Sequence, residues 1–94
     1  MKPSPGDFVE FWLEPCWHYG MVEKIQGGQG GKVRVEAFCV DLDRQGAIKL
    51  QKMNLFGLSM EFEKLRLVNP DVIFVDIEGW TLSIRELYEA VSNR

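Results

Sequence analysis

Two cysteines and one histidine are the side chains of this 94-residue chain best suited to covalent chemistry. Cys16 and His18 lie in FWLEPCWHYG, and Cys39 follows later. A thiolate beside an imidazole that accepts its proton would form a thiol hydrolase or acyltransferase site. On one strand, however, residues two apart point the same way with side chains about 6–7 Å apart, too far for a hydrogen bond unless Pro15 bends the chain. A thiol hydrolase centred on His18 is therefore kept as a third hypothesis.

The same residues do not complete a usual zinc site, which takes four ligands, so we expect no metal and no cofactor. The N-terminal MKPSPGDFVEF lacks the apolar stretch of a signal peptide. No apolar run approaches the roughly 20 residues of a membrane span. We expect a cytoplasmic protein without membrane association. In that compartment both cysteines should be buried free thiols, with a single disulfide as the alternative.

Other polar motifs carry weaker indications of function. Glu10 and Glu14 share a strand face, while Asp41 and Asp43 lie in a turn, where Asp is favoured by its backbone hydrogen bonds. The GGQGG run lacks the Lys-Ser/Thr pair and the strand-to-helix setting of a phosphate loop. We therefore do not expect an enzyme.

The charge of the chain is uneven. The net charge of −3 argues against general nucleic-acid binding, which is typical of basic domains. Residues 44–66 nevertheless hold five basic and two acidic side chains. If Arg44, Lys49 and Lys52 cluster, they could bind an acidic peptide or a nucleic-acid backbone, with an affinity that falls steeply with salt. A nucleic-acid-associated module using the 44–66 stretch is the second hypothesis.

Apolar residues alternate with polar ones along most of the chain, which predicts strands. The expected strands cover residues 7–14, 17–25, 32–42, 47–51 and 63–68. Residues 53–62 are interpreted as a helical turn followed by an extended piece. Glycine-rich turns between short strands indicate a mainly β protein, a small antiparallel barrel or sandwich.

The last third of the chain has a different pattern. Residues 71–77, DVIFVDI, are apolar on both faces, so we expect a strand covered on both sides. Ser83 and Glu86 match a capping box. The apolar residues that follow at helical spacing predict a short amphipathic helix that must dock on the rest of the protein; they are Ile84, Leu87, Tyr88 and Val91.

Residues 5–69 resemble the SH3-like barrels of the Tudor group. The resemblance lies in PGDFVEF, WHYGMVEKI, VRVEAFCVDLDRQG and EKLRLV. It implies a barrel at 5–69. The length of 94 residues predicts a single domain over residues 1–94, with the C-terminal strand plus helix at 70–94 packed on the barrel. Such domains commonly bind partner peptides, often through a methylated Lys or Arg in an aromatic cage. The resemblance places Trp17 or Tyr19 in a cage wall and Asp41 beside it, with Leu42 where a further aromatic is usual.

The opening PGDFVEFW and HYGMVE also look like the start of lecithin–retinol acyltransferase-like thiol hydrolases. In that family Gly-Asp precedes a His on the next strand, and the nucleophilic Cys begins a later helix. Here the late helix begins with Ser83, and no Cys follows Cys39. The nucleophile that the resemblance implies is missing.

The alternation places Val9, Phe11, Leu13, Val33, Val35, Ala37 and Cys39 inside the sheet. Phe8, Trp12 and Phe38 then lie on the opposite face, and soluble monomers rarely leave so large an apolar patch uncovered. Either the chain's own helix at 84–91 covers it, or a partner protein or second copy does. We expect a non-catalytic adaptor that binds a protein or peptide through surface aromatics. The expected contact residues are Trp12, Trp17, Tyr19 and Phe38, with Glu14, Asp41 and Asp43 favouring a basic partner.

Overall fold

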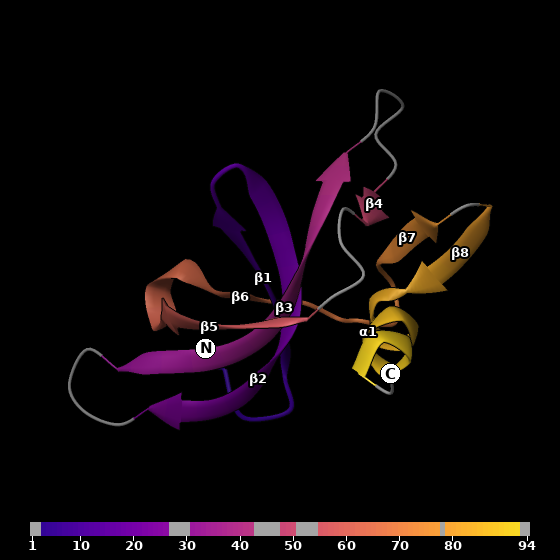
Figure 1. The fold of residues 1–94 in the computed structure, drawn as a ribbon. Coiled ribbons are helices and arrows are strands. Elements are labelled where there is room, and N and C mark those ends of the chain that lie inside the picture. The colour runs from indigo at the N-terminus through magenta and orange to yellow at the C-terminus, as the bar shows by residue number, and fades with distance from the viewer. Residues whose placement is uncertain (1–2, 27–30, 43–47, 51–54, 78, 93–94) are drawn as a thin grey trace.

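The computed structural model describes residues 3–26, 31–42, 48–50, 55–77 and 79–92, with the backbone alone at 41–42 and 48–50. Three long strands form its centre: β1 (Phe8–Leu13), β2 (Cys16–Gln26) and β3 (Lys32–Leu42), each antiparallel to the next (Figure 1). Strand β5 (Phe56–Glu61) pairs with β3, and after a 3-10 turn, η1 (Phe62–Lys64), the short β6 (Arg66–Leu67) pairs with β1. The first two-thirds of the chain is therefore a curled antiparallel sheet.

The C-terminal part extends this sheet at the end of β3. Strand β4 (Ile48–Leu50) pairs with β3 and, in parallel, with β7 (Phe74–Ile77). Strand β8 (Trp80–Ser83) forms a hairpin with β7 and leads directly into helix α1 (Ile84–Ser92). No helix in the described part of the chain is long and apolar enough to cross a membrane.

The expectation of a mainly β, largely antiparallel protein with a short C-terminal helix is confirmed. The expected closed barrel differs from the structure. Strand pairing runs β6-β1-β2-β3-β4-β7-β8 with β5 beside β3, and within the described residues the sheet is not closed. Among the described residues, β5 does not pair with β6, the contact that would close the ring. Strand β3 is also shared between two branches of the sheet. One stretch of it pairs with β5, and its last residues diverge to pair with β4.

Three segments differ from their predictions. Residues 56–61 form a strand, and the helical turn expected before them falls mostly outside the described residues. The strand expected at 63–68 is reduced to Arg66–Leu67, because η1 takes the residues before it. Finally, the strand expected at 71–77 is shortened to β7 and is not covered on both sides: Val75 is buried, but Phe74 is exposed, as is Val72 before the strand.

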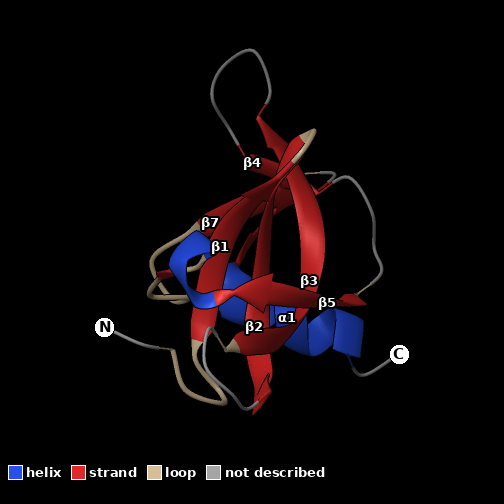
Figure 2. Ribbon diagram, turned by 90° about the vertical axis from the view of Figure 1, so that its left-hand side faces the viewer, coloured by secondary structure: helices blue, strands red, loops and turns tan. Residues whose placement is uncertain are grey.

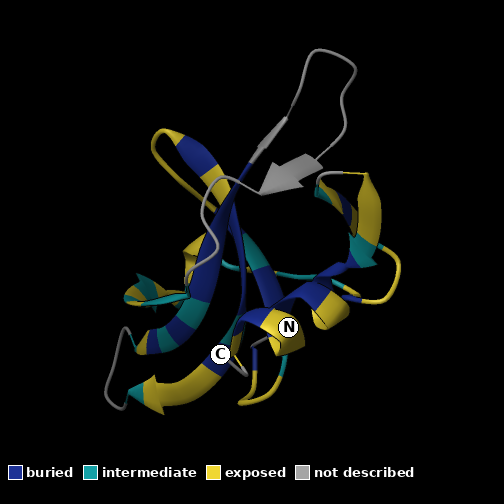
Figure 3. Ribbon diagram, turned by 45° about the vertical axis from the view of Figure 1, so that its right-hand side comes forward, coloured by how far each residue is buried: buried dark blue, intermediate teal, exposed yellow. Residues whose placement is uncertain are grey.

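The sheet separates two apolar clusters, and helix α1 packs against one face of it (Figure 2). The inner cluster lies within the curl formed by β1–β3, β5 and β6, and its buried members are Val9, Phe11, Val22, Val33, Val35 and Ala37. The outer cluster lies between the other face of β1–β3 and the β7–α1 unit. Its members are Phe8, Tyr19, Phe38, Val40, Val75, Ile84, Leu87, Tyr88 and Val91. The chain's own helix therefore covers Phe8 and Phe38, as one of the two sequence hypotheses predicted. Figure 3 shows that α1 has a buried side and an exposed side.

Helix α1 begins with the predicted capping box. The Glu86 N–H donates to Ser83 Oγ at 3.1 Å, and the Ser83 N–H donates to Glu86 Oε1 at 3.0 Å. These two bonds satisfy backbone donors that the first turn of a helix cannot pair internally. The capping box therefore fixes where the covering helix starts.

Replacing Ser83→Ala should lower the free energy of unfolding by about 1 kcal/mol, because one capping bond is lost at a buried position. Urea denaturation followed by circular dichroism measures the change. Ser92→Ala is the matched control, since the Ser92 hydroxyl is exposed and bonds only the Glu89 carbonyl within its own helix. It should change stability by less than about 0.5 kcal/mol. Equal losses in both variants would contradict the capping role.

Candidate functional site

Two tryptophans form an exposed pair at the end of the β1–β2 hairpin. Trp12 and Trp17 are opposite each other in the β1–β2 register, so both side chains leave the same face of the sheet. Their ring centroids are 5.6 Å apart with planes at 72°, an edge-to-face contact. Trp12 is 52% exposed and Trp17 is 41% exposed. The pair is thus a preformed aromatic corner open to solvent.

The corner continues the outer apolar face. Trp17 is in register with Val40, which belongs to the cluster that α1 covers. The outer face is therefore closed at one end by α1 and open at the other, where the tryptophans lie. The open end is the part of this face that a partner could reach.

Tyr19 and Phe38 do not belong to this open end, and the prediction that they lie at the surface is wrong. Phe38 is fully buried and Tyr19 is 7% exposed, since both pack in the cluster beneath α1. Burial is the main cause that raises the pKa of Tyr19, and a hydrogen bond with Glu10 adds to it. Tyr19 therefore cannot form a wall of an open cage.

Glu14 is exposed in the turn that joins β1 to β2, next to the tryptophan pair in sequence. Glu10, on the same strand face as Trp12, lies 3.3 Å from the Arg66 guanidinium and is already paired. Among the predicted acidic contacts, Glu14 is the one whose side chain the structure describes. Asp43, Arg44 and Lys52 lie outside the described residues, and for Asp41 and Lys49 only the backbone is described.

Cys16 and Cys39 form a disulfide, so the expectation of two free thiols is wrong. The bond links the start of β2 to β3, with 6.4 Å between the two Cα atoms. Both residues are buried. In this form the Cys16 sulfur is bonded and cannot act as the nucleophile of a thiol hydrolase. The cytoplasmic location stays a prediction.

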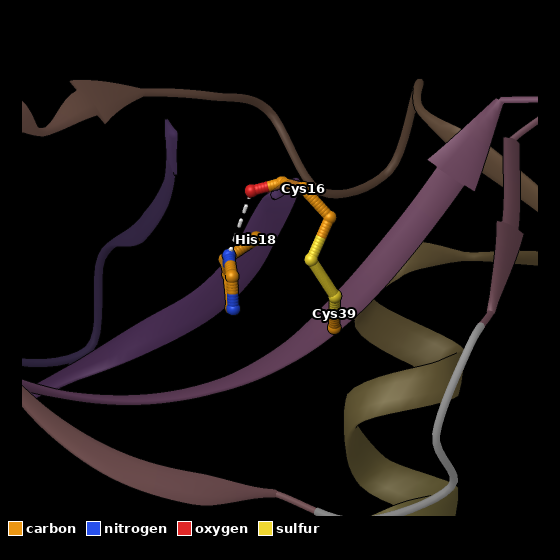
Figure 4. Close-up of a disulfide and its surroundings, with 3 residues drawn as sticks. All are labelled: Cys16, His18 and Cys39. Atoms are coloured by element: carbon orange, nitrogen blue, oxygen red, sulfur yellow. Dashed lines mark hydrogen bonds between the residues drawn. A yellow bond between two sulfur atoms is a disulfide. The ribbon is translucent and has the colours of Figure 1, made fainter. Parts of the chain in front are cut away.

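His18 lies beside the disulfide on the same strand as Cys16 (Figure 4). Its Nδ1 donates a hydrogen bond to the Cys16 carbonyl oxygen at 3.1 Å. Its ring stacks on Phe11 at 5.2 Å and meets Phe56 edge-on at 5.8 Å. Burial lowers the pKa of His18, and the bond to the carbonyl partly opposes that change. The imidazole is therefore held in place on three sides.

A β-bulge brings these three residues onto one face of the sheet. In the β2–β3 ladder the register shifts by one residue between Val22 and Lys24. Without that shift, the pairing Ile25↔Val33 would continue to set Tyr19 opposite Cys39, and His18 and Cys39 would lie on opposite faces of the sheet. With the shift, His18 is opposite Cys39. The bulge therefore decides that His18 and Cys39 share one face of the sheet.

Sequence patterns missed a polar cluster where α1 meets the sheet. The Tyr88 hydroxyl donates to Glu36 Oε2 at 3.2 Å, and Arg34 pairs with Glu23 at 3.5 Å. A hydrogen bond with Glu23, followed by burial, raises the pKa of Glu36. Burial and the Glu36 charge raise the pKa of Tyr88 to about 12. The sequence pattern predicts Tyr88 as an apolar helix residue. Its hydroxyl group was the feature that could have indicated a buried polar contact.

A hollow of about 410 Å³ lies at the other side of α1, lined in part by Phe8, Val68 and Arg85. The Arg85 guanidinium bonds both carboxylate oxygens of Asp71, at 2.8 and 3.3 Å, and that contact raises its pKa. It also lies 5.3 Å from the centre of the Phe8 ring. Because its cation is already paired, we do not take this hollow as the site.

Further exposed apolar residues lie on the β7–β8 hairpin. Trp80 is 73% exposed and Phe74 is also exposed. Phe74 is opposite Ser83, while Trp80 is opposite Ile77, so the two rings leave opposite faces of the hairpin. They do not form a shared surface, unlike Trp12 and Trp17. The tryptophan pair on β1–β2 is thus the stronger candidate for a contact site.

Comparison of the chain with family models, curated proteins and solved structures found no match.

Proposed function

We propose that this protein is a non-catalytic interaction module that binds a basic segment of a partner protein at the Trp12–Trp17 corner. The observation that carries the proposal is the exposure of both indoles in a contact that is already formed. Large apolar rings left open on a small protein are typical of binding surfaces. Tryptophan is also enriched among the residues that dominate the energy of protein interfaces.

The fold supports this proposal. Strands β6, β1, β2, β3 and β5 follow one another in the sheet, and a 3-10 turn lies between β5 and β6. This order is similar to that of SH3-like barrels, the class that the Tudor-like sequence pattern implies. Peptide recognition through aromatic residues near strand ends is common in that class. Trp12 and Trp17 occupy such a strand end.

The chemistry of the corner favours a cationic side chain. The faces of indole rings attract a guanidinium or ammonium group, and Trp is the strongest of the aromatic side chains in this respect. Glu14 in the adjoining turn adds a carboxylate, and the net charge of −3 attracts a basic segment at longer range. A partner segment carrying Arg or Lys fits these features.

A direct test uses an array of peptides that share one sequence and differ only at the centre: Arg, Lys, trimethyl-lysine, norleucine or Glu. We expect peptides with a cationic centre to bind and the norleucine and Glu peptides to bind more weakly. Replacing Trp12→Ala or Trp17→Ala should weaken binding by about 30-fold, the effect of losing about 2 kcal/mol at an interface hot spot. Fluorescence anisotropy measures the dissociation constants.

Trp80→Ala is the matched control, because Trp80 is even more exposed but lies on the other hairpin. It should leave binding unchanged. Equal binding of the norleucine and arginine peptides, or an equal loss in W80A, would contradict the proposal. Sedimentation analysis of the free protein tests whether a second copy of the chain binds at the corner instead. If the wild type is a dimer and W12A is a monomer, the second copy is the partner.

A further inference from the structure

We propose that the reduced form of this protein binds one Cu(I) ion through the sulfur atoms of Cys16 and Cys39 and the imidazole of His18. One donor atom from each of these residues lies within 4.8 Å of the other two, and all three residues are buried. They are the only group of three or more His, Cys, Asp or Glu residues so placed in the part of the chain that the structure describes. The proposal is independent of the tryptophan corner.

The donors are positioned by the strands. His18 and Cys39 are directly opposite in the β2–β3 register, and Cys16 is two residues from His18 on the same strand face. The 6.4 Å between the Cα atoms of the two cysteines leaves room for their sulfur atoms to separate around an ion once the disulfide is opened. Two neighbouring strands therefore present all three donors on one face of the sheet.

The opening step requires a dithiol reductant. A dithiol gives two electrons and two protons to the Cys16–Cys39 bond, the sulfur–sulfur bond breaks, and two thiols form while the reductant becomes a disulfide. On binding Cu(I) the two thiols release two protons to solvent and the sulfurs bind as thiolates. The ion itself is neither oxidised nor reduced.

The donor set favours Cu(I) over other ions. Thiolates select soft ions such as Cu(I) and Zn(II), and imidazole binds both. Zn(II) in structural sites takes four ligands, whereas Cu(I) is well satisfied by two or three. The cluster supplies three buried donors, and Phe11 and Phe56 pack against the imidazole. A three-coordinate monovalent ion matches this site.

His18 is oriented as metal-binding histidines usually are. Such residues donate one ring N–H to a carbonyl or carboxylate, which fixes the ring and leaves the other nitrogen with its lone pair. Here Nδ1 donates to the Cys16 carbonyl, so Nε2 carries the lone pair of the neutral ring. Stacking on Phe11 and contact with Phe56 hold the ring plane. The imidazole is thus pre-oriented before any ion arrives.

The test titrates Cu(I) into the full chain under nitrogen, with bathocuproine disulfonate as a coloured competitor. One sample is reduced with dithiothreitol, which is then removed, and the other is left oxidised. We expect the reduced protein to withdraw one equivalent of copper and the oxidised protein to withdraw none. His18→Gln should weaken copper binding by at least about 100-fold. Losing a residue that only supports a metal ligand already weakens binding by up to about 100-fold, and His18 is proposed as a ligand itself. A Cys16→Ser/Cys39→Ser variant should not bind.

X-ray absorption of the copper-loaded wild type gives a readout that does not depend on the folding of any variant. Two sulfur neighbours and one nitrogen neighbour would support the proposal. It is overturned if the reduced protein leaves all copper with the competitor, if only sulfur surrounds the ion, or if the oxidised protein binds equally well. A parallel titration with Zn(II) tests the choice of ion, and tighter binding of zinc than of copper would overturn it.

Discussion

Replacing Phe38→Ala is expected to lower the free energy of unfolding by about 3–5 kcal/mol, the usual cost of removing a fully buried aromatic ring. Phe38 has no exposed surface and lies between β3 and α1 in the outer cluster. The truncation removes the ring's burial and leaves a cavity that the sheet and helix can only partly fill. Urea denaturation, monitored by circular dichroism, measures the loss.

Trp12→Ala is the matched comparison on the same face of the sheet. Because Trp12 is half exposed, its removal should cost only about 1 kcal/mol, mostly from the lost ring contact with Trp17. The two variants together separate core from contact surface: F38A should lose stability, whereas W12A should lose partner binding. A loss of 3 kcal/mol or more in W12A, or under about 1 kcal/mol in F38A, would contradict the arrangement.

Breaking the Cys16–Cys39 bond should have the second large effect on stability. The two cysteines are separated by 23 positions, and closing a loop of that size restricts the unfolded chain by about 3–4 kcal/mol in the chain-entropy model. Domains of this size are stable by about 5–15 kcal/mol in total. Cys16→Ser/Cys39→Ser should therefore melt more than about 10 °C below the wild type. Differential scanning calorimetry measures the melting temperatures.

A reductant provides the control for this experiment. Dithiothreitol should lower the melting temperature of the wild type and leave that of the double serine variant unchanged. Alkylation with iodoacetamide in denaturant, without reductant, should add no mass to the wild type. Two added alkyl groups would show that the cysteines are free and would contradict the disulfide.

The two faces of the sheet were predictable from the sequence, and so was the helix that covers one of them. Alternation along the strands set Phe11 and Val35 inside and Phe8 and Phe38 outside. The same alternation placed Leu13 inside, and that prediction is wrong: Leu13 is exposed at the end of β1. The Ser83–Glu86 pair marked the start of the helix. What alternation could not give is how far the helix reaches over the outer face. The extent of this coverage determines that Tyr19 is buried while Trp17 is exposed. It depends on the pairing of β4 with β7, which no local sequence pattern encodes.

The Cys16–His18–Cys39 cluster was only half predictable. The spacing of Cys16 and His18 put them on one face of a strand, but Cys39 joins them only because β2 holds one extra residue at the bulge. The residues at the bulge, Glu23 to Ile25, carry no strong sequence signal for it. Without the bulge, Cys16 and His18 would lie on the face of the sheet opposite to Cys39. Gly20, which lies on the same strand as the bulge, has a different role. A Cβ there would overlap the Glu36 carbonyl oxygen, so the residue permits close approach of β2 and β3.

The position of α1 at the end of the element order has a consequence for synthesis. A chain emerges from the ribosome with its N-terminus first. Phe8, Tyr19 and Phe38 are therefore synthesised well before Ile84. Until the helix emerges and docks, these three rings and the tryptophan corner form one continuous exposed apolar surface on the growing chain. Nascent β-rich chains with such surfaces are prone to aggregate, so we expect this stage, rather than the finished protein, to be the one most dependent on chaperones.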